Sequence, residues 1–156
     1  MKFKSFRNIS IIFLLSISSC QTKDQIEKVE FAGNITEGKI SDYTKNNDYL
    51  MYYFSGNCSL CYGYITTIEA ALKEIPLICI SSSTDTILLN EYFNKINFKG
   101  NFIVDDNYLF FKRNPLLSTN RWLYVDSKNK ILVKSPDFVN DKSLNSFKEK
   151  VNNLKN

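Results

Sequence analysis

Residues 49–75 constrain the fold more than any other stretch of the chain. Tyr49–Phe54 is a continuous apolar and aromatic run, with the length expected of a strand that is covered on both faces. A turn-forming Ser-Gly-Asn sequence follows it, and then come Cys58 and Cys61, separated by two residues. Beyond the cysteines the apolar spacing becomes helical. The pattern therefore predicts a buried strand, a tight turn, and a helix that begins at the cysteine pair.

The helical pattern after the cysteines has one apolar face. Its members recur three or four residues apart, at Ile65, Ile68, Leu72 and Ile75. Pro76 comes directly after the last of them, and proline cannot continue a helix because it lacks the backbone N–H. We therefore expect the helix to run to this proline.

Strand and helix patterns alternate along the rest of the domain. Runs rich in apolar and β-branched residues predict strands at residues 29–35, 77–80, 102–104, 121–125 and 130–134. Helical spacing predicts a helix through residues 87–96 and a last one through residues 144–154, capped by Asp141 or Ser143. This order predicts an α/β fold with a central mixed β-sheet flanked by helices on both faces, a β-hairpin and a C-terminal helix.

The first residues have the pattern of an export signal. Lys2, Lys4 and Arg7 precede an apolar run at residues 9–17, which is too short to span a bilayer comfortably. Small residues then precede Cys20, and this arrangement resembles the lipobox of bacterial lipoproteins. The resemblance implies cleavage before Cys20 and attachment of lipid to its thiol. An ordinary secretory signal with an incidental cysteine is the alternative.

The chain of 156 residues divides, on this pattern, into a signal peptide at 1–19, a polar tether at 20–30 and one domain at 31–156. Loss of the three basic signal residues lowers the formal net charge from +4 to +1, so nothing argues for a nucleic-acid partner. The lipobox implies a bacterial cell-envelope protein that is lipid-anchored and faces the periplasm. Gln21 is not the aspartate that often signals inner-membrane retention, which favours the outer membrane.

Four cysteines and no histidine limit the chemistry of the chain. Without histidine, Ser-His-Asp and Cys-His catalysis and all histidine-containing metal sites are excluded. A four-cysteine zinc site would need Cys20 and Cys79 at spacings that zinc sites do not show, so no metal or cofactor is expected. Cys79 lies in an apolar run and is expected to be a buried strand cysteine. Cys58 and Cys61 remain as a pair that an exported protein can hold as a disulfide.

The strand, turn, Cys-x-x-Cys and helix together resemble a thioredoxin-type redox site, and the chain from Phe31 to Leu154 resembles the TlpA-like or ResA-like thioredoxin domains. The motifs that carry the resemblance are a Ser41-Asp42 pair ahead of the site, the Cys58–Cys61 pair, a short strand ending in Asp105, and a hairpin running from Trp122 to Ile131. The resemblance implies a thioredoxin-like fold and a membrane-anchored thiol-disulfide oxidoreductase.

Three positions depart from that family. Asn57 stands where the family usually has tryptophan, and Tyr52 stands where thioredoxins carry a buried acid. Asn120 occupies the place of a cis-proline in the loop that lies against the cysteine pair. Since a cis peptide bond before a residue other than proline costs about 3 kcal/mol, we expect the Thr119–Asn120 bond to be trans. Thr119 and Asn120 are nonetheless the substrate-binding loop that the resemblance implies.

The resemblance assigns a role to each cysteine. Cys58, at the N-terminus of the helix, is the nucleophile, because helix N-termini favour the thiolate. Cys61 is the resolving thiol that closes the disulfide. The Ser59-Leu60 pair contains neither proline nor histidine, which favours a reductant of exported-protein disulfides. The partners implied are such a protein, with a disulfide or a dithiol, and an electron donor of the membrane or envelope.

Other interpretations remain open on sequence alone. The cysteine pair could be a structural disulfide in a non-catalytic binding lipoprotein on the same scaffold. A peroxiredoxin-like peroxidase needs threonine where Ser55 stands and a proline upstream, and a copper-handling protein needs a histidine. The aromatic residues near the site belong either to the core or to an apolar docking surface: Tyr52, Tyr53, Phe54, Tyr62 and Tyr64.

Overall fold

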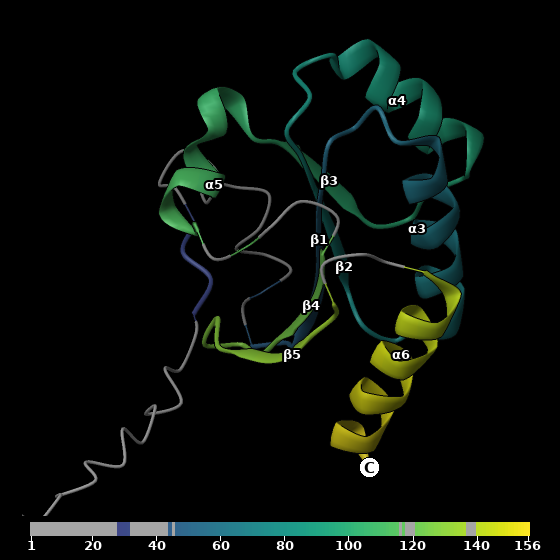
Figure 1. The fold of residues 1–156 in the computed structure, drawn as a ribbon, viewed down its shortest axis with the longest axis vertical. Helices are drawn as coiled ribbons and strands as arrows, with labels where there is room; N and C mark the ends of the chain where they lie inside the picture. The colour runs from purple at the N-terminus through teal and green to yellow at the C-terminus, as the bar shows by residue number, and fades with distance from the viewer. Residues whose placement is uncertain (1–27, 32–43, 45, 116, 118–120, 137–139) are drawn as a thin grey trace, which may run out of the picture.

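A computed structural model describes residues 28–31, 44, 46–115, 117, 121–136 and 140–156. Its centre is a five-stranded sheet with the order β3-β2-β1-β4-β5 (Figure 1). The strands are β1 (Tyr49–Phe54), β2 (Leu77–Ser81), β3 (Asn101–Val104), β4 (Arg121–Val125) and β5 (Ile131–Lys134). Strands β1, β2 and β3 are parallel, whereas β4 is antiparallel to β1 and β5 to β4. The predicted mixed sheet and its terminal hairpin are confirmed.

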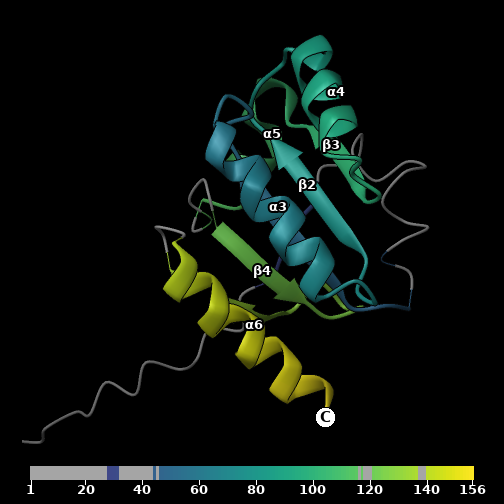
Figure 2. The same ribbon diagram turned by 90° about the vertical axis from the view of Figure 1, so that its right-hand side faces the viewer.

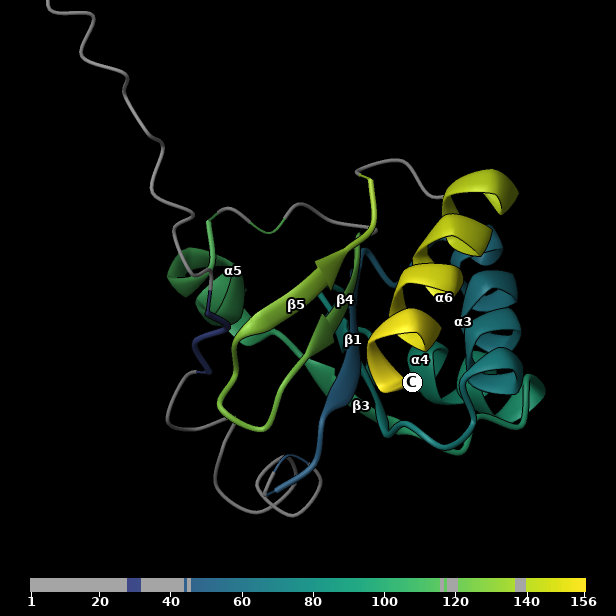
Figure 3. The same cartoon turned by 90° about the horizontal axis from the view of Figure 1, so that it is seen from below.

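Helices cover both faces of this sheet. They are α3 (Ser59–Ala71), α4 (Thr86–Lys95), the 3₁₀ turn η1 (Asp106–Tyr108), α5 (Leu109–Arg113) and α6 (Asp141–Lys155). Figure 2 shows α3 and α6 crossing in front of the sheet, and Figure 3 shows α5 on the opposite side. Side chains of α4 join the same core as those of α3 and α6. The predicted α/β architecture is therefore confirmed.

Strand β1 separates two hydrophobic cores because its side chains alternate between the faces of the sheet. Leu50, Tyr52 and Phe54 point into the core beneath α3, α4 and α6, which we call the α3 face. Tyr49, Met51 and Tyr53 point into the core beneath α5, which we call the α5 face. All six residues are buried, as predicted for a strand covered on both faces.

Helix α3 ends earlier than predicted, at Ala71 rather than next to Pro76. Leu72 has non-helical dihedrals, and the N–H of Ile75 donates to the carbonyl of Leu72 in a turn. The residue before a proline is disfavoured in the helical conformation, so the chain leaves the helix before Ile75. Ile75 is still buried, and this explains why it continued the apolar pattern.

The caps of the last helix also differ from the prediction. Asn140 is the N-cap: its side-chain oxygen accepts from the Ser143 N–H, and the Ser143 hydroxyl accepts from the Asn140 N–H. This reciprocal capping box satisfies two backbone donors, so neither Asp141 nor Ser143 is the N-cap. Leu154, expected on the apolar stripe, is 58% exposed.

The first predicted strand is not formed where the structure describes it. Lys28 makes an isolated bridge with Lys130, and residues 29–31 are not in a strand. Instead, the Asn114 side chain accepts from the Glu30 N–H and donates to the Glu30 carbonyl. A side chain is thus the partner of the Glu30 backbone, whereas the Val29 N–H donates to the backbone carbonyl of Asn129. Residues 32–35 lie outside the described residues.

Several predictions fall on parts of the chain outside the described residues. They are the signal peptide at 1–19, the lipid attachment at Cys20, the Ser41-Asp42 pair, and the loop with Thr119 and Asn120. Within the described ranges, no helix combines the length and the apolar character needed to cross a bilayer.

Candidate redox site

The turn between β1 and α3 is shaped by Gly56. This residue has a φ of +77°, a conformation that side-chain-bearing residues rarely adopt. A Cβ atom at this position would also lie 2.5 Å from the Ser81 hydroxyl oxygen and 2.6 Å from the Cβ of Ser83. Glycine is therefore required both by the backbone conformation and by the contact with the end of β2.

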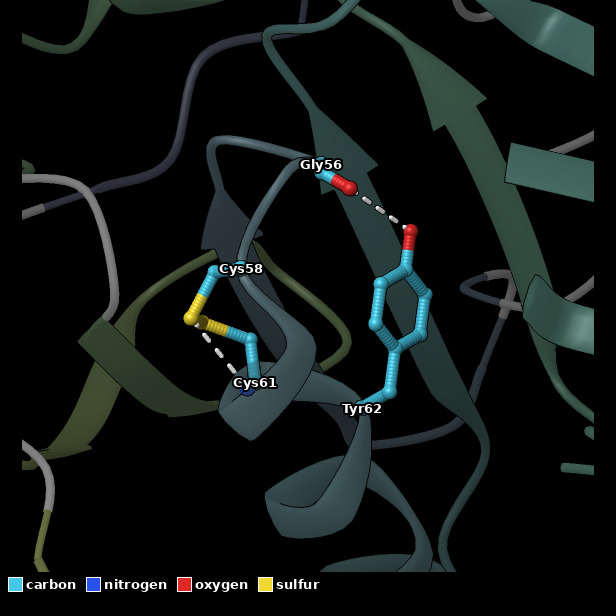
Figure 4. Close-up of a disulfide and its surroundings, with 4 residues drawn as sticks. All are labelled: Gly56, Cys58, Cys61 and Tyr62. Atoms are coloured by element: carbon cyan, nitrogen blue, oxygen red, sulfur yellow. Dashed lines mark hydrogen bonds between the residues drawn. A yellow bond between two sulfur atoms is a disulfide. The ribbon is translucent and has the colours of Figure 1, made fainter. Parts of the chain in front are cut away.

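Cys58 follows this turn as the N-cap of α3. Its backbone is extended, and its Sγ accepts a hydrogen bond of 3.2 Å from the Cys61 N–H (Figure 4). The two cysteines form a disulfide whose Cα atoms are 5.2 Å apart. The sequence spacing therefore brings both predicted cysteines together, with the sulfur of Cys58 at the start of the helix.

The two cysteines of the disulfide differ in their exposure. Cys58 is half-buried, whereas Cys61 is only 2% exposed. Leu60, between them, is 73% exposed and leaves the outer side of the pair accessible. An external thiol or disulfide can therefore reach Cys58, while Cys61 lies behind it.

The start of α3 favours negative charge on the Cys58 sulfur. The first N–H groups of a helix have no partner within it, and the helix dipole is positive at this end. No acidic residue lies in the first turn of α3. After reduction, the N–H of Cys61 and the dipole would stabilise a Cys58 thiolate, which is the reactive form of a cysteine.

Tyr62 connects the helix back to the turn. Its hydroxyl donates a buried hydrogen bond of 2.9 Å to the carbonyl of Gly56 (Figure 4). The Tyr62 ring stacks on Tyr92 with the centroids 4.6 Å apart, and it meets the edges of Phe54 and Phe93. Burial, with a smaller effect of Tyr92, raises the pKa of Tyr62 to about 12, so its hydroxyl remains a donor.

Four of the five aromatic residues near the site belong to the core and not to a docking surface. Tyr52, Tyr53, Phe54 and Tyr62 are all buried, and Tyr64 is half-buried. The docking alternative is wrong for the four buried rings, because a partner cannot contact them in the folded chain. Their apolar area instead stabilises the sheet that carries the cysteine pair.

Tyr52 is the residue that the sequence resemblance places where thioredoxins carry a buried acid. Its ring stacks on Trp122, with the centroids 4.2 Å apart, and on Phe54 at 5.4 Å. The buried Tyr52 hydroxyl has no hydrogen-bond partner among the residues that the structure describes. Burial, followed by the nearby Cys79 and Tyr64, raises the pKa of Tyr52. A neutral hydroxyl therefore replaces the carboxylate at this place.

Cys79 is a fully buried free cysteine in β2, as predicted. Burial, with a smaller contribution from Glu69, raises the pKa of its thiol. A protonated, inaccessible thiol is neither a nucleophile nor a metal ligand. Cys79 is thus part of the core on the α3 face.

Asp105 is a buried acid whose structural role the sequence pattern did not predict. Its carboxylate accepts from the Tyr53 hydroxyl at 3.0 Å and from the N–H groups of Phe110 at 2.7 Å and Phe111 at 3.1 Å. It thereby ties the end of β3 to β1 and caps the start of α5. The sequence showed an acid directly after an apolar strand, but it did not show its partners, because Tyr53 lies 52 residues away from Asp105.

No protein-family profile matches the chain, and no curated protein matches it by sequence. Solved structures do match. One is of a protein named as the thiol:disulfide interchange protein DsbE of Chlorobium tepidum, with a TM-score of 0.63, 10% identity, and 75% of this chain and 85% of that chain covered. A second is of the peroxidoxin BcpB of Mycobacterium tuberculosis, with a TM-score of 0.62, 10% identity and coverage of 75% and 86%.

A third match is of a protein named as a protein disulfide isomerase of Bacteroides thetaiotaomicron, with a TM-score of 0.60, 16% identity, and 74% of this chain and 78% of that chain covered. At such identities the likeness concerns the fold. The sheet order, the flanking helices and the cysteine pair at the start of α3 agree with it. The chain therefore has a thioredoxin-like fold, as the resemblance in the sequence implied.

Proposed function

We propose that this protein is a thiol-disulfide oxidoreductase, with Cys58 as the nucleophile and Cys61 as the resolving thiol. The observation that carries the proposal is the disulfide at the N-cap of α3, with one accessible and one buried cysteine. A structural disulfide does not need this asymmetry, whereas an exchange reaction does. Two of the three matched structures described above are of proteins named for disulfide exchange, which supports the same reading.

The reaction proceeds in two exchanges. In the reduced protein, the Cys58 thiolate attacks one sulfur of a substrate disulfide; a mixed disulfide forms, and the other substrate sulfur leaves as a thiolate. The Cys61 thiolate then attacks the Cys58 sulfur, closes the Cys58–Cys61 bond and releases the second substrate thiolate. Two electrons have passed from the protein to the substrate. A dithiol donor must reduce the Cys58–Cys61 bond before the next cycle.

The resemblances in the sequence support a class of substrate and a location. We expect the substrate to be the disulfide of an exported protein, docked beside the loop with Thr119 and Asn120, and the donor to be a dithiol protein of the membrane or envelope. Lipid on Cys20 would hold the domain at the envelope, on the periplasmic side and preferably on the outer membrane. The polar tether at 20–30 would separate the domain from the bilayer.

Thiol chemistry tests the central claim. The purified protein should accelerate the reduction of a model disulfide by dithiothreitol, and Cys58→Ser should lower the rate to that of dithiothreitol alone. Cys61→Ser should accumulate the mixed disulfide, which mass spectrometry detects. Cys79→Ala is the matched control and should retain activity, because this cysteine is buried away from the reaction. A Cys58→Ser variant as active as the wild type would refute the proposal.

A peroxidase is the second candidate, because one matched structure is of a peroxidoxin. In that case the Cys58 thiolate would attack a peroxide and not a disulfide. Ser55, three residues before Cys58, stands where peroxiredoxins carry threonine. Peroxide consumption measured in the same preparation separates the two: turnover of peroxide much faster than that of the model disulfide would favour the peroxidase.

Membrane attachment has a separate test. Cys20→Ala should move the protein from the membrane fraction to the soluble fraction after cell lysis, because its anchoring lipid would be lost. A Ser19→Ala variant keeps the cysteine and a small neighbour and is the control. Unchanged membrane retention of Cys20→Ala would contradict the anchor without affecting the redox proposal.

A further inference from the structure

We propose that the Tyr62 hydroxyl is a positioning group that shifts the redox equilibrium of the cysteine pair towards the disulfide, and so makes the reduced protein a stronger reductant. This inference rests on the proposed exchange at Cys58 and Cys61. It adds a residue that the exchange mechanism itself does not require.

The hydrogen bond of Tyr62 spans the cysteine pair. Tyr62 directly follows Cys61, and its partner, the Gly56 carbonyl, lies two residues before Cys58. The hydrogen bond and the disulfide therefore close the same short segment of chain, one around the other (Figure 4).

Both ends of this hydrogen bond are held by their surroundings. On the turn side, Gly56 lies against Ser81 and Ser83, and the Ser82 N–H donates to the Phe54 carbonyl just before the turn. On the helix side, the Tyr62 ring is packed among Phe54, Tyr92 and Phe93. These contacts orient the two groups, while the hydrogen bond and the disulfide both restrain the short segment of chain that lies between them.

Linkage gives the direction of the effect. A disulfide holds residues 56 and 62 close, so the hydrogen bond forms at a lower entropic cost in the oxidised protein than in the reduced one. By reciprocity, the hydrogen bond favours closure of the disulfide by the same factor. It holds the two thiols near the geometry of the bond that they form, which raises their effective concentration. The hydroxyl stays protonated at neutral pH, since burial raises the pKa of Tyr62 to about 12.

The test is the redox equilibrium of a Tyr62→Phe variant. This change keeps the ring and removes only the oxygen. We expect the equilibrium constant for disulfide formation, measured against a series of dithiothreitol or glutathione buffers, to fall by up to about tenfold, the limit reached if the hydrogen bond forms only in the oxidised protein. A tenfold fall corresponds to a reduction potential about 30 mV less negative.

Tyr92→Phe is the matched control. It removes a hydroxyl from the ring stacked on Tyr62, so it keeps the aromatic packing and should leave the equilibrium constant unchanged. Unfolding of the oxidised and of the reduced forms supplies a second measurement. If the hydroxyl only stabilises the fold, its removal should lower the free energy of unfolding equally in both forms. The proposal requires a larger loss in the oxidised form.

The outcomes separate this inference from the proposed function. Normal disulfide reduction by the wild type, with equal equilibrium constants for wild type and Tyr62→Phe, would overturn the role of the Tyr62 hydroxyl and leave the proposed enzyme intact. A shifted equilibrium in Tyr62→Phe, with no turnover by the wild type, would support the role of the hydroxyl and count against catalysis.

Discussion

Tyr52 and Tyr53 are neighbours on β1, and both are buried, yet they lie in different environments. On the α3 face, the Tyr52 ring stacks between Phe54 and Trp122, and its hydroxyl has no hydrogen-bond partner among the described residues. On the α5 face, the Tyr53 hydroxyl donates to Asp105. One face is held by packed rings, and the other also contains a buried polar network.

The polar network has a structural task. Asp105 caps α5, and Asn114, at the end of α5, binds both backbone groups of Glu30. Helix α5 has only five residues, too few to be stable by itself. The hydrogen bonds of Asp105 specify the position of α5, and those of Asn114 specify the position of Glu30. The longer helices α3 and α6 are positioned by their apolar side chains, which pack into the core of the α3 face. The cysteine pair at the start of α3 is supported by this core.

Removal of the Asp105 carboxylate should have the largest effect. Asp105→Ala leaves the Tyr53 hydroxyl and two N–H groups of α5 without their acceptor. We expect a loss of about 3 kcal/mol or more in the free energy of unfolding, because each buried donor without a partner costs about 1–3 kcal/mol. Urea denaturation measures it. Asp106→Ala, an exposed neighbour, is the control, and equal losses in the two variants would contradict the network.

Asn114→Ala should have the next largest effect, about 2 kcal/mol, since it removes the amide that binds Glu30 and also donates to the Phe110 carbonyl. Amide hydrogen exchange at Glu30 should accelerate, because this N–H loses its acceptor. Asn90→Ala, at an exposed position on α4, should not change exchange there. Unaltered protection of the Glu30 amide in Asn114→Ala would show that another group holds this segment.

These two residues also show where sequence patterns stop being informative. Apolar runs of strand length predicted β1 and the final hairpin, and helical spacing of apolar residues predicted α3, because elements that face a core must direct apolar side chains into it. The partners of Asp105 and Asn114 lie up to 52 and 84 residues away, and no local pattern records such pairs. The strand predicted at 29–35 was wrong at 29–31 for this reason: the Val29 N–H still donates to the Asn129 carbonyl, but the Asn114 side chain binds both backbone groups of Glu30.

The candidate site also has one part that the sequence predicted and one part that it did not. The Cys-x-x-Cys spacing predicted the disulfide and its place at a helix N-terminus. The hydrogen bond from Tyr62 to Gly56 was not predictable, although both residues lie next to the cysteines. The orientation of the Tyr62 ring, and so the direction in which its hydroxyl points, depends on how Tyr92 and Phe93 of α4 pack against the ring. Tertiary contacts between separate helices determine this orientation.

Alkaline pH offers a third test, at Cys79 on the α3 face. Burial raises the pKa of this thiol above its ordinary value of 9.0. The folded state then keeps a proton that the unfolded state releases, so stability is fully present below about pH 9 and falls as the pH rises. The loss is at most about 1.4 kcal/mol for each pH unit.

The measurement is urea denaturation at pH 8, 9 and 10 for wild type and Cys79→Ala. The variant begins less stable because of the cavity, but its stability should decline less steeply between pH 9 and 10. Buried tyrosines contribute to the decline in both proteins. Parallel curves would show that Cys79 titrates normally and therefore reaches solvent.

The smallest effects come from the two tyrosines themselves, and they test the comparison most directly. Tyr53→Phe removes one donor from Asp105 and should cost about 1 kcal/mol in the free energy of unfolding. Tyr52→Phe removes a buried oxygen that has no partner among the described residues, so it should be neutral or slightly stabilising. Because the two changes are chemically identical and adjacent on one strand, each is the control for the other. If Tyr52→Phe were as destabilising as Tyr53→Phe, the Tyr52 hydroxyl would be hydrogen-bonded in solution, and the two tyrosines would not differ in their environment as described.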